Sequence, residues 1–195
     1  MKFTRIPESA FKELVLNAGY LATTFDPAAG TAPEESALLG ATTGGINFTA
    51  VPSFTDFGED IDNCPKNMKE LKQIESWEVK CSGTYVSASA ENAKSMLGAA
   101  DITSKVSKIT PRNDLKDSDF TDLWLLCDYS DKHGTTNGGF CAIHMLNTLS
   151  TGGFSLQTGD KEKGQMSFEY TAHYSITAQD TVPCEVYIKA GEDEA

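Results

Sequence analysis

Alternation of apolar and polar residues is the clearest structural signal in this chain. Between positions 77 and 85 the odd residues are Trp, Val, Cys, Gly and Tyr, and the even ones are Glu, Lys, Ser and Thr. A second alternating run extends from Met166 to Ile176. A period of two places one face of a strand on a core and the other face in water. Both segments are therefore predicted to be strands.

Shorter segments predict further strands. Residues 123–129 and 140–146 are apolar at successive positions, which is typical of strands that are covered on both faces. Residues 46–51 and 184–188 are shorter candidate strands, and residues 14–21 are compatible with a strand or a short helix.

One short helix is predicted beside these strands. Ser89 can cap a helix that begins at residue 90, and Gly98 can end it. Its apolar residues share one side: Ala90, Ala93, Met96 and Leu97. Two turns are too short to be stable alone, so this helix must pack on a sheet. We expect a single mainly-β domain over residues 1–195 (α+β only by count), a sandwich or partial barrel with one flanking helix.

Three segments lack a regular pattern. Residues 1–45 are irregular and end with a predicted turn. This turn contains Gly40, Gly44 and Gly45, because it needs positive φ angles. Residues 52–72 predict a long loop of about 20 residues, and loops of this length usually serve binding or assembly. The candidate contact residues in it are Phe54, Phe57, Glu59, Asp60 and Asp62. Residues 190–195 form an acidic tail.

Charge narrows the classes of partner. The 195 residues include 28 acidic and 16 basic side chains, a formal charge of −12. Binding nucleic-acid phosphates or an anionic membrane requires a surplus of Lys and Arg, so both kinds of partner are disfavoured.

No apolar run approaches the ~20 residues that span a bilayer, and Pro7 and Glu8 interrupt any signal-peptide pattern. We therefore expect synthesis inside a cell.

The cysteines favour free thiols in a reducing compartment. They are odd in number, widely spaced and without a CxxC pair: Cys64, Cys81, Cys127, Cys141 and Cys184.

No motif predicts catalysis. The glycines at 40–45 are not followed by the Lys and Ser or Thr of a phosphate loop, and no Gly-x-Ser-x-Gly elbow is present. His133, His144 and His173 have no metal-ligand spacing to a cysteine or a carboxylate. Cys141 and His144 are close in sequence, but an odd separation on a strand puts their side chains on opposite faces.

The acidic residues after position 116 do not complete a metal site either. Asp117, Asp119 and Asp122 resemble half of a calcium loop without its glycine and closing Glu. Capping of a helix start by Asp117 or Ser118 is the favoured interpretation. We expect no enzyme activity, no cofactor and no metal.

Several segments, in their order and spacing, carry a resemblance that extends over roughly residues 11–190. The segments are 17–19, 25–27, 40–48, 149–154, 166–174 and 183–188. Together they resemble the phage major tail tube protein family. No single motif among them is specific, so the resemblance depends on the whole set.

The resemblance implies a mainly-β fold related to the inner-tube protein of type VI secretion. It implies a structural virion protein of a phage or prophage, made in the host bacterial cytoplasm and located in the tail. Subunits of that family form hexameric rings that stack into a hollow tube, so the resemblance implies the same assembly here. It also implies that DNA passes through the tube without specific binding, and that other tail proteins are partners. Extended loops and a terminal arm bridge neighbouring subunits in such tubes, and residues 52–72 and 1–45 are the matching candidates.

Elementary physics is compatible with that assembly. Six copies at −12 give a formal −72, and a negative channel wall would repel DNA over a Debye length of ~8 Å. The charge can equally lie outside and serve solubility. Unpaired strand edges are templates for pairing with a neighbouring copy.

The alternative is a monomeric β-sandwich that binds a glycan or peptide through its long loop. An exposed aromatic platform that includes Trp77 or Tyr129 would favour this alternative.

Overall fold

The structure is a computed structural model that describes residues 5–103, 107–129 and 138–191. His133 and most of the predicted acidic tail lie outside these described residues. Within them, no helix combines the length and the apolar character that crossing a bilayer requires.

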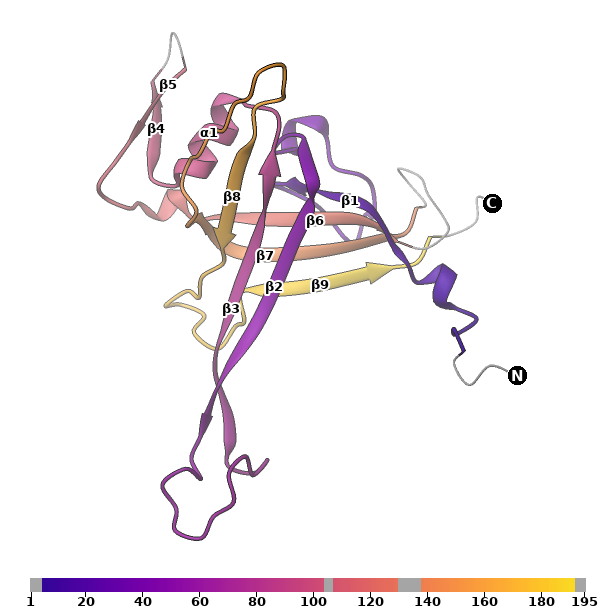
Figure 1. The fold of residues 1–195 in the computed structure, drawn as a ribbon, viewed down its shortest axis with the longest axis vertical. Helices are drawn as coiled ribbons and strands as arrows, with labels where there is room; N and C mark the ends of the chain where they lie inside the picture. Colours follow the sequence, from indigo (N-terminus) through magenta and orange to yellow (C-terminus); the bar gives the residue numbers. More distant parts are fainter. Residues whose placement is uncertain (1–4, 104–106, 130–137, 192–195) are drawn as a thin grey trace.

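The described chain forms a seven-stranded antiparallel sheet, a two-stranded sheet and one α-helix (Figure 1). The elements are η1 (Ala10–Lys12), β1 (Val15–Ala22), η2 (Glu35–Ala37), β2 (Thr42–Asp56), β3 (Lys72–Tyr85), α1 (Ala90–Leu97), β4 (Ala100–Thr103), β5 (Lys108–Pro111), η3 (Asp117–Asp119), β6 (Thr121–Tyr129), β7 (Phe140–Ser150), β8 (Met166–Thr171) and β9 (Cys184–Lys189). The strand order in the large sheet is β1-β6-β7-β8-β3-β2, with β9 paired to β7. This confirms the mainly-β prediction with one short helix, and the sheet does not close into a barrel.

Strand β7 is where the large sheet turns. Its residues 140–145 lie between β6 and β9, whereas Leu149 and Ser150 pair with β8. One layer therefore holds β1, β6, β7 and β9, and the other holds β8, β3 and β2. The strands of the two layers cross at a steep angle (Figure 1).

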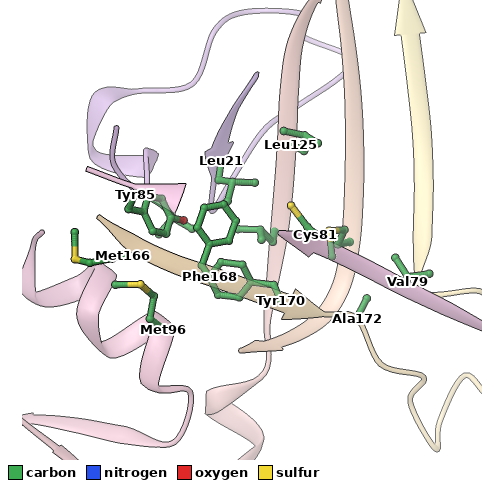
Figure 2. Close-up of a cluster of buried hydrophobic side chains, with 13 residues drawn as sticks. Leu21, Val79, Cys81, Tyr85, Met96, Leu125, Met166, Phe168, Tyr170 and Ala172 are labelled. Atoms are coloured by element: carbon green, nitrogen blue, oxygen red, sulfur yellow. The ribbon is translucent and has the colours of Figure 1, made fainter. Parts of the chain in front are cut away.

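The main core fills the space between these layers and beneath α1 (Figure 2). Strand β3 contributes Val79, Cys81 and Tyr85, all without exposed surface, which confirms the predicted alternation from residue 77 to 85. A smaller cluster around Trp124 and Leu126 covers the other face of β6. The prediction of a strand covered on both sides is thereby confirmed for residues 123–126, whereas Asp128 is exposed.

Helix α1 begins and ends where its caps predict. The Ser89 side chain accepts a hydrogen bond from the Asn92 backbone N–H at 3.0 Å, and Gly98 ends the helix at a φ of 68°. The buried side chains are Met96, which joins the main core, and Asn92.

The structure corrects four predictions. The loop predicted at 52–72 is strand at both ends, and only residues 57–71 connect β2 to β3. The segment 1–45 is less irregular than expected, because β1 lies within it and pairs with β6. Gly44 and Gly45 lie inside β2, at a shift in its register with β3, and do not form a turn before the strand.

The fourth correction concerns the strand predicted over 166–176, which ends at Thr171. Beyond it the His173 N–H donates to the Leu146 carbonyl at 3.2 Å, so the chain turns toward β7 although the alternation in sequence continues.

We predict that Val79→Ala lowers the free energy of unfolding by about 2 kcal/mol, because it leaves a cavity in a fully buried site. Val51→Ala is the matched control on an exposed site of the same hairpin, and should stay within about 0.5 kcal/mol of the parent protein. Urea unfolding followed by circular dichroism measures both. Equal losses for the two variants would contradict the placement of the core.

Candidate functional site

The β2–β3 hairpin extends far beyond the two layers (Figure 1). Near the body its side chains pack on the main core, among them Phe48, Ala50 and Val79. From residue 51 to 78 every residue except Gly58 is half-buried or exposed. We call residues 51–78 the arm. It is a two-stranded ribbon with no further strand beside it among the described residues.

The arm continues the register that builds the core. Paired residues in antiparallel strands share a face, and the face alternates along the ribbon. From the body toward the tip, the pairs on the core-facing side are Phe48–Cys81, Ala50–Val79, Pro52–Trp77 and Phe54–Ile74. The first two pairs are covered by the opposite layer. The last two continue this face toward the tip, and we call them the apolar stripe (Pro52, Phe54, Ile74 and Trp77). Trp77 still packs partly on the main core, and its backbone N–H donates to the Tyr174 hydroxyl at 2.9 Å. Phe54 and Ile74 form the exposed outer part of the stripe.

The two faces of the arm differ in chemistry. On the apolar stripe, Phe54 is 50% and Ile74 48% exposed, and the Lys72 ammonium lies 4.7 Å from the Phe54 ring centroid. On the other face the Ser53 and Ser76 hydroxyls are 2.8 Å apart, and Thr55 donates to Glu75 at 3.3 Å. Val51, 54% exposed, is the apolar exception on that polar face. The arm is therefore amphipathic, and the outer part of its apolar face, at Phe54 and Ile74, is about half-exposed.

An acidic side chain closes the tip of the arm. The Asp56 carboxylate accepts hydrogen bonds from the backbone N–H groups of Gly58 and Asn67, both at 2.9 Å. These bonds hold the pKa of Asp56 below its ordinary value, with smaller contributions from Lys72 and Lys66. Asp56 thus links the start of the segment 57–71 to Asn67, and the Phe57 N–H donates to the Leu71 carbonyl at 3.0 Å across its two ends.

The predicted contact residues are partly gathered here. Four of them are exposed in the segment 57–71 at the tip of the arm, as a contact role requires: Phe57, Glu59, Asp60 and Asp62. Phe54 belongs to β2 and not to a loop, because strand pairing with Ile74 extends that far.

Part of the exposed apolar surface of the arm was not predicted from the sequence. Ile61 and Met68 add exposed apolar side chains at the tip, and Ile74 completes the stripe. The signal for Ile74 was weak because a register shift at Glu75 breaks the period of two before Trp77. The predicted turn glycine Gly40 lies elsewhere, against the Asn92 side chain beside α1.

In the large sheet, three strands leave a backbone edge without a strand partner among the described residues. They are β2 and β1, at the two ends of the strand path, and β9, which pairs only with β7. The last residues of β1 are bonded by the segment 37–39, where the Leu39 N–H donates to the Leu21 carbonyl at 3.0 Å, so the β1 edge is open only before Leu21. Val186 and Ile188 on β9 are also largely exposed. Such edges can pair with a strand from another chain.

The histidines described here do not form a nucleophile–base pair. The His144 ring stacks on Trp124 at a centroid distance of 4.0 Å, with Asp122 3.3 Å from Nε2 and Glu185 3.6 Å from Nδ1. Cys141 lies on the opposite face of β7, toward the main core, as predicted from the odd separation.

His173 lies close to the backbone of Asn147. Its Nδ1 is 3.1 Å from the Asn147 carbonyl oxygen, so one ring nitrogen is held by a main-chain contact.

The acidic residues near position 119 serve local structure. The Asp119 carboxylate accepts from the Lys116 N–H at 2.8 Å and from Arg112 at 2.6 Å. These bonds hold its pKa below the ordinary value. The predicted caps at Asp117 or Ser118 are therefore wrong, because Asp119 reaches back to the start of η3. Across the described ranges, no group of three or more His, Cys, Asp or Glu residues could hold a metal ion.

All five cysteines are free thiols in the structure. Burial raises the pKa of Cys81 to about 12 and that of Cys127 to about 11. Both thiols therefore stay protonated at neutral pH, and the thiolate needed for nucleophilic chemistry is scarce.

A cleft of about 820 Å³ opens between α1, residues 36–39 and residues 118–123. Helix α1, which borders the cleft, lies at the end of the molecule opposite the arm (Figure 1). Trp77 and Tyr129, the aromatic residues that a binding platform would use, do not line it and are both half-buried.

No protein-family model and no curated protein matches this chain. The functional interpretation therefore depends on the arm, the open strand edges and the cleft.

We predict that the Asp56 lock opens in acid. Its folded pKa lies below the unfolded value of about 3.9, so its contribution is present above that value and is lost as the pH falls through the folded pKa. In an NMR titration, the amide signals of Gly58 and Asn67 should shift in a transition below pH 3.9. Asp56→Asn should abolish the transition and Glu59→Gln should leave it. A midpoint at or above 3.9 would contradict the lock.

Proposed function

We propose that this chain is a structural virion protein, the subunit of a phage tail tube. In this proposal six copies join head to tail into a ring, and the rings stack into a hollow tube that conducts DNA. The observation that carries the proposal is the apolar stripe, which continues the core-facing register along the arm and whose outer residues, Phe54 and Ile74, no other strand of the described residues covers.

An uncovered apolar stripe favours association. Burying apolar surface contributes about 25 cal/mol per Å², so half-exposed Phe54 and Ile74 favour any partner that covers them. Larger exposed apolar patches mark interaction sites. In this proposal the arm contacts a different surface of the next copy, so the contact between copies is heterologous. A heterologous contact builds a closed ring when its rotation closes.

The open edges of β1, β2 and β9 support the same proposal. Pairing an edge with a neighbouring copy satisfies backbone N–H and C=O groups that one chain leaves to water. Two kinds of contact are thus available to one copy, the sheet edges and the arm. A stacked tube needs two kinds, one within a ring and one between rings.

The charge suits a conduit. Six copies at −12 carry a formal −72, and an acidic wall repels the DNA backbone within about one Debye length. DNA would then slide through the tube without a specific binding site. We place no cofactor or metal in this function.

A second candidate function is a monomeric module that binds a peptide or glycan. The cleft beside α1 favours it, because its volume of about 820 Å³ falls within the usual range of ligand sites. Light scattering separates the two candidates, since this second one requires a monodisperse 21.0 kDa particle at every concentration.

We predict rings or tubes of the parent protein at high concentration in negative-stain microscopy. Ile74→Ser removes one of the two exposed apolar side chains of the stripe. We expect the loss of buried apolar area to weaken association by about 1.4 kcal/mol or more, which raises the concentration needed for assembly at least tenfold. Val51→Ser changes an equally exposed residue on the polar face and should assemble like the parent. Identical assembly of both variants would contradict the role of the stripe.

We also predict that the tip is dispensable for folding and required for assembly. Asp56 and Lys72 are directly paired, so residues 57–71 can be replaced by Asn-Gly, which closes a two-residue hairpin. The shortened protein should keep its circular dichroism spectrum and its cooperative unfolding but form no tubes. Tubes of normal length would refute the assembly role of the tip.

A further inference from the structure

Two cysteines lie directly opposite each other on neighbouring strands of the large sheet. Cys127 on β6 is the register partner of Cys141 on β7, and no other two cysteines are paired in this way among the described strands. Paired residues of antiparallel strands share a face, with Cα atoms about 4.5–5.5 Å apart. A disulfide needs Cα atoms about 4.4–6.8 Å apart. The backbone therefore already holds these two residues at a separation that a disulfide can bridge.

The pair lies at the rim of the main core. Leu125 and Ile143 form the preceding pair on the same face, and both pack in that core. Cys127 also packs against it, whereas Cys141 belongs to neither hydrophobic cluster, and both cysteines are half-buried. On its other side Cys141 is paired with Ile188 of the edge strand β9, which is 61% exposed. Cys141 is therefore the member of the pair that is more open to a small solute.

The Cys127 thiol leans away from its partner in the reduced protein. Its Sγ lies 2.6 Å from the position that a Cβ atom would take on Gly19, so it occupies space that only a glycine of β1 leaves free. Strand β1 is on the opposite side of β6 from β7. Rotation about χ1 moves a side chain between staggered positions without moving the backbone. Closing the bond thus requires one side-chain rotation at Cys127.

We propose that Cys127 and Cys141 form a redox-dependent disulfide that links β6 to β7, open in a reducing compartment and closed by a small-molecule disulfide such as oxidised glutathione. The Cys141 thiolate attacks one sulfur of the small disulfide, which releases one thiol and leaves a mixed disulfide on Cys141. The Cys127 thiolate then attacks the Cys141 sulfur and displaces the second thiol. The two cysteines lose two electrons and two protons, which the two released thiols carry away. This inference goes beyond the proposed function and does not depend on assembly.

Burial sets the rate of this reaction. It raises the pKa of Cys127 to about 11 and also raises the pKa of Cys141, so few thiolates are present at neutral pH. Exchange between thiols and disulfides proceeds through the thiolate. The bond therefore forms slowly near neutral pH and faster as the pH rises, so prolonged exposure to an oxidant closes it and brief contact does not.

The bond restricts a defined part of the chain. It closes a loop of 15 residues, from Cys127 to Cys141. A cross-link of this kind reduces the conformational freedom of the unfolded chain and thereby stabilises the folded protein. Since β7 pairs with β9 and β8 as well, the bond fixes β6 to the strand that joins the two layers.

Mapping of the thiols after oxidation tests the proposal. The parent protein is incubated with oxidised glutathione at mildly alkaline pH and digested, and linked peptides are identified by mass spectrometry. We expect a Cys127–Cys141 link at least tenfold more abundant than any other link, and its loss on treatment with dithiothreitol. Cys184→Ser removes another half-buried thiol and should leave the yield of this link unchanged. A Cys81–Cys127 link in its place, or no link within the chain, would overturn the proposal.

Urea unfolding measures what the bond does. The midpoint of the oxidised parent should lie about 1 M above that of the reduced parent, and dithiothreitol should reverse the shift. Cys141→Ser should show the same midpoint before and after the oxidant. Equal midpoints for the oxidised and the reduced parent would overturn the stabilising role of the bond. Neither measurement depends on tubes, so the proposed function can fail while this inference stands, and the reverse.

Discussion

The register between β2 and β3 is the constraint on which the rest of the structure depends. A shift by one residue would turn Val79, Cys81 and Tyr85 out of the core, because the side chains of a strand alternate strictly. The same register also decides which side chains the arm displays. One pattern therefore builds the interior near the body and an apolar surface beyond it. The half of the hairpin near the body faces an opposing layer, and the outer half does not.

That opposing layer exists because β7 serves two neighbours in turn. Its first part pairs with β9 and β6, and its last two residues pair with β8. The sheet folds over its own core at this point, and α1 closes the remaining side through Met96. Since the layers cross steeply, they overlap over a limited area. The long β2–β3 hairpin leaves this area, and beyond Trp77 no other strand of the described chain lies against it.

Much of this fold could be predicted from the sequence where the physics is local. The alternation from residue 77 to 85, the Ser89 cap and the Gly98 end were sufficient to place β3 and α1. Prediction failed where pairing between distant segments decides the outcome. Pro52 lies in a strand because its partner Trp77 holds it there, and the strand after Met166 ends because the backbone of His173 bonds to β7. The cleft could not be predicted, since it is bounded by three segments that are remote in sequence.

The carboxylate of Asp56 bears on the rate and the entropic cost of the association proposed for the arm. A long surface loop normally samples many conformations, and ordering it on contact with another molecule is entropically unfavourable. Here two main-chain amides are already engaged by one side chain, so the extremity of the hairpin is preorganised. A preorganised extremity needs no induced fit, and collisions in the correct orientation can become productive without a slow rearrangement.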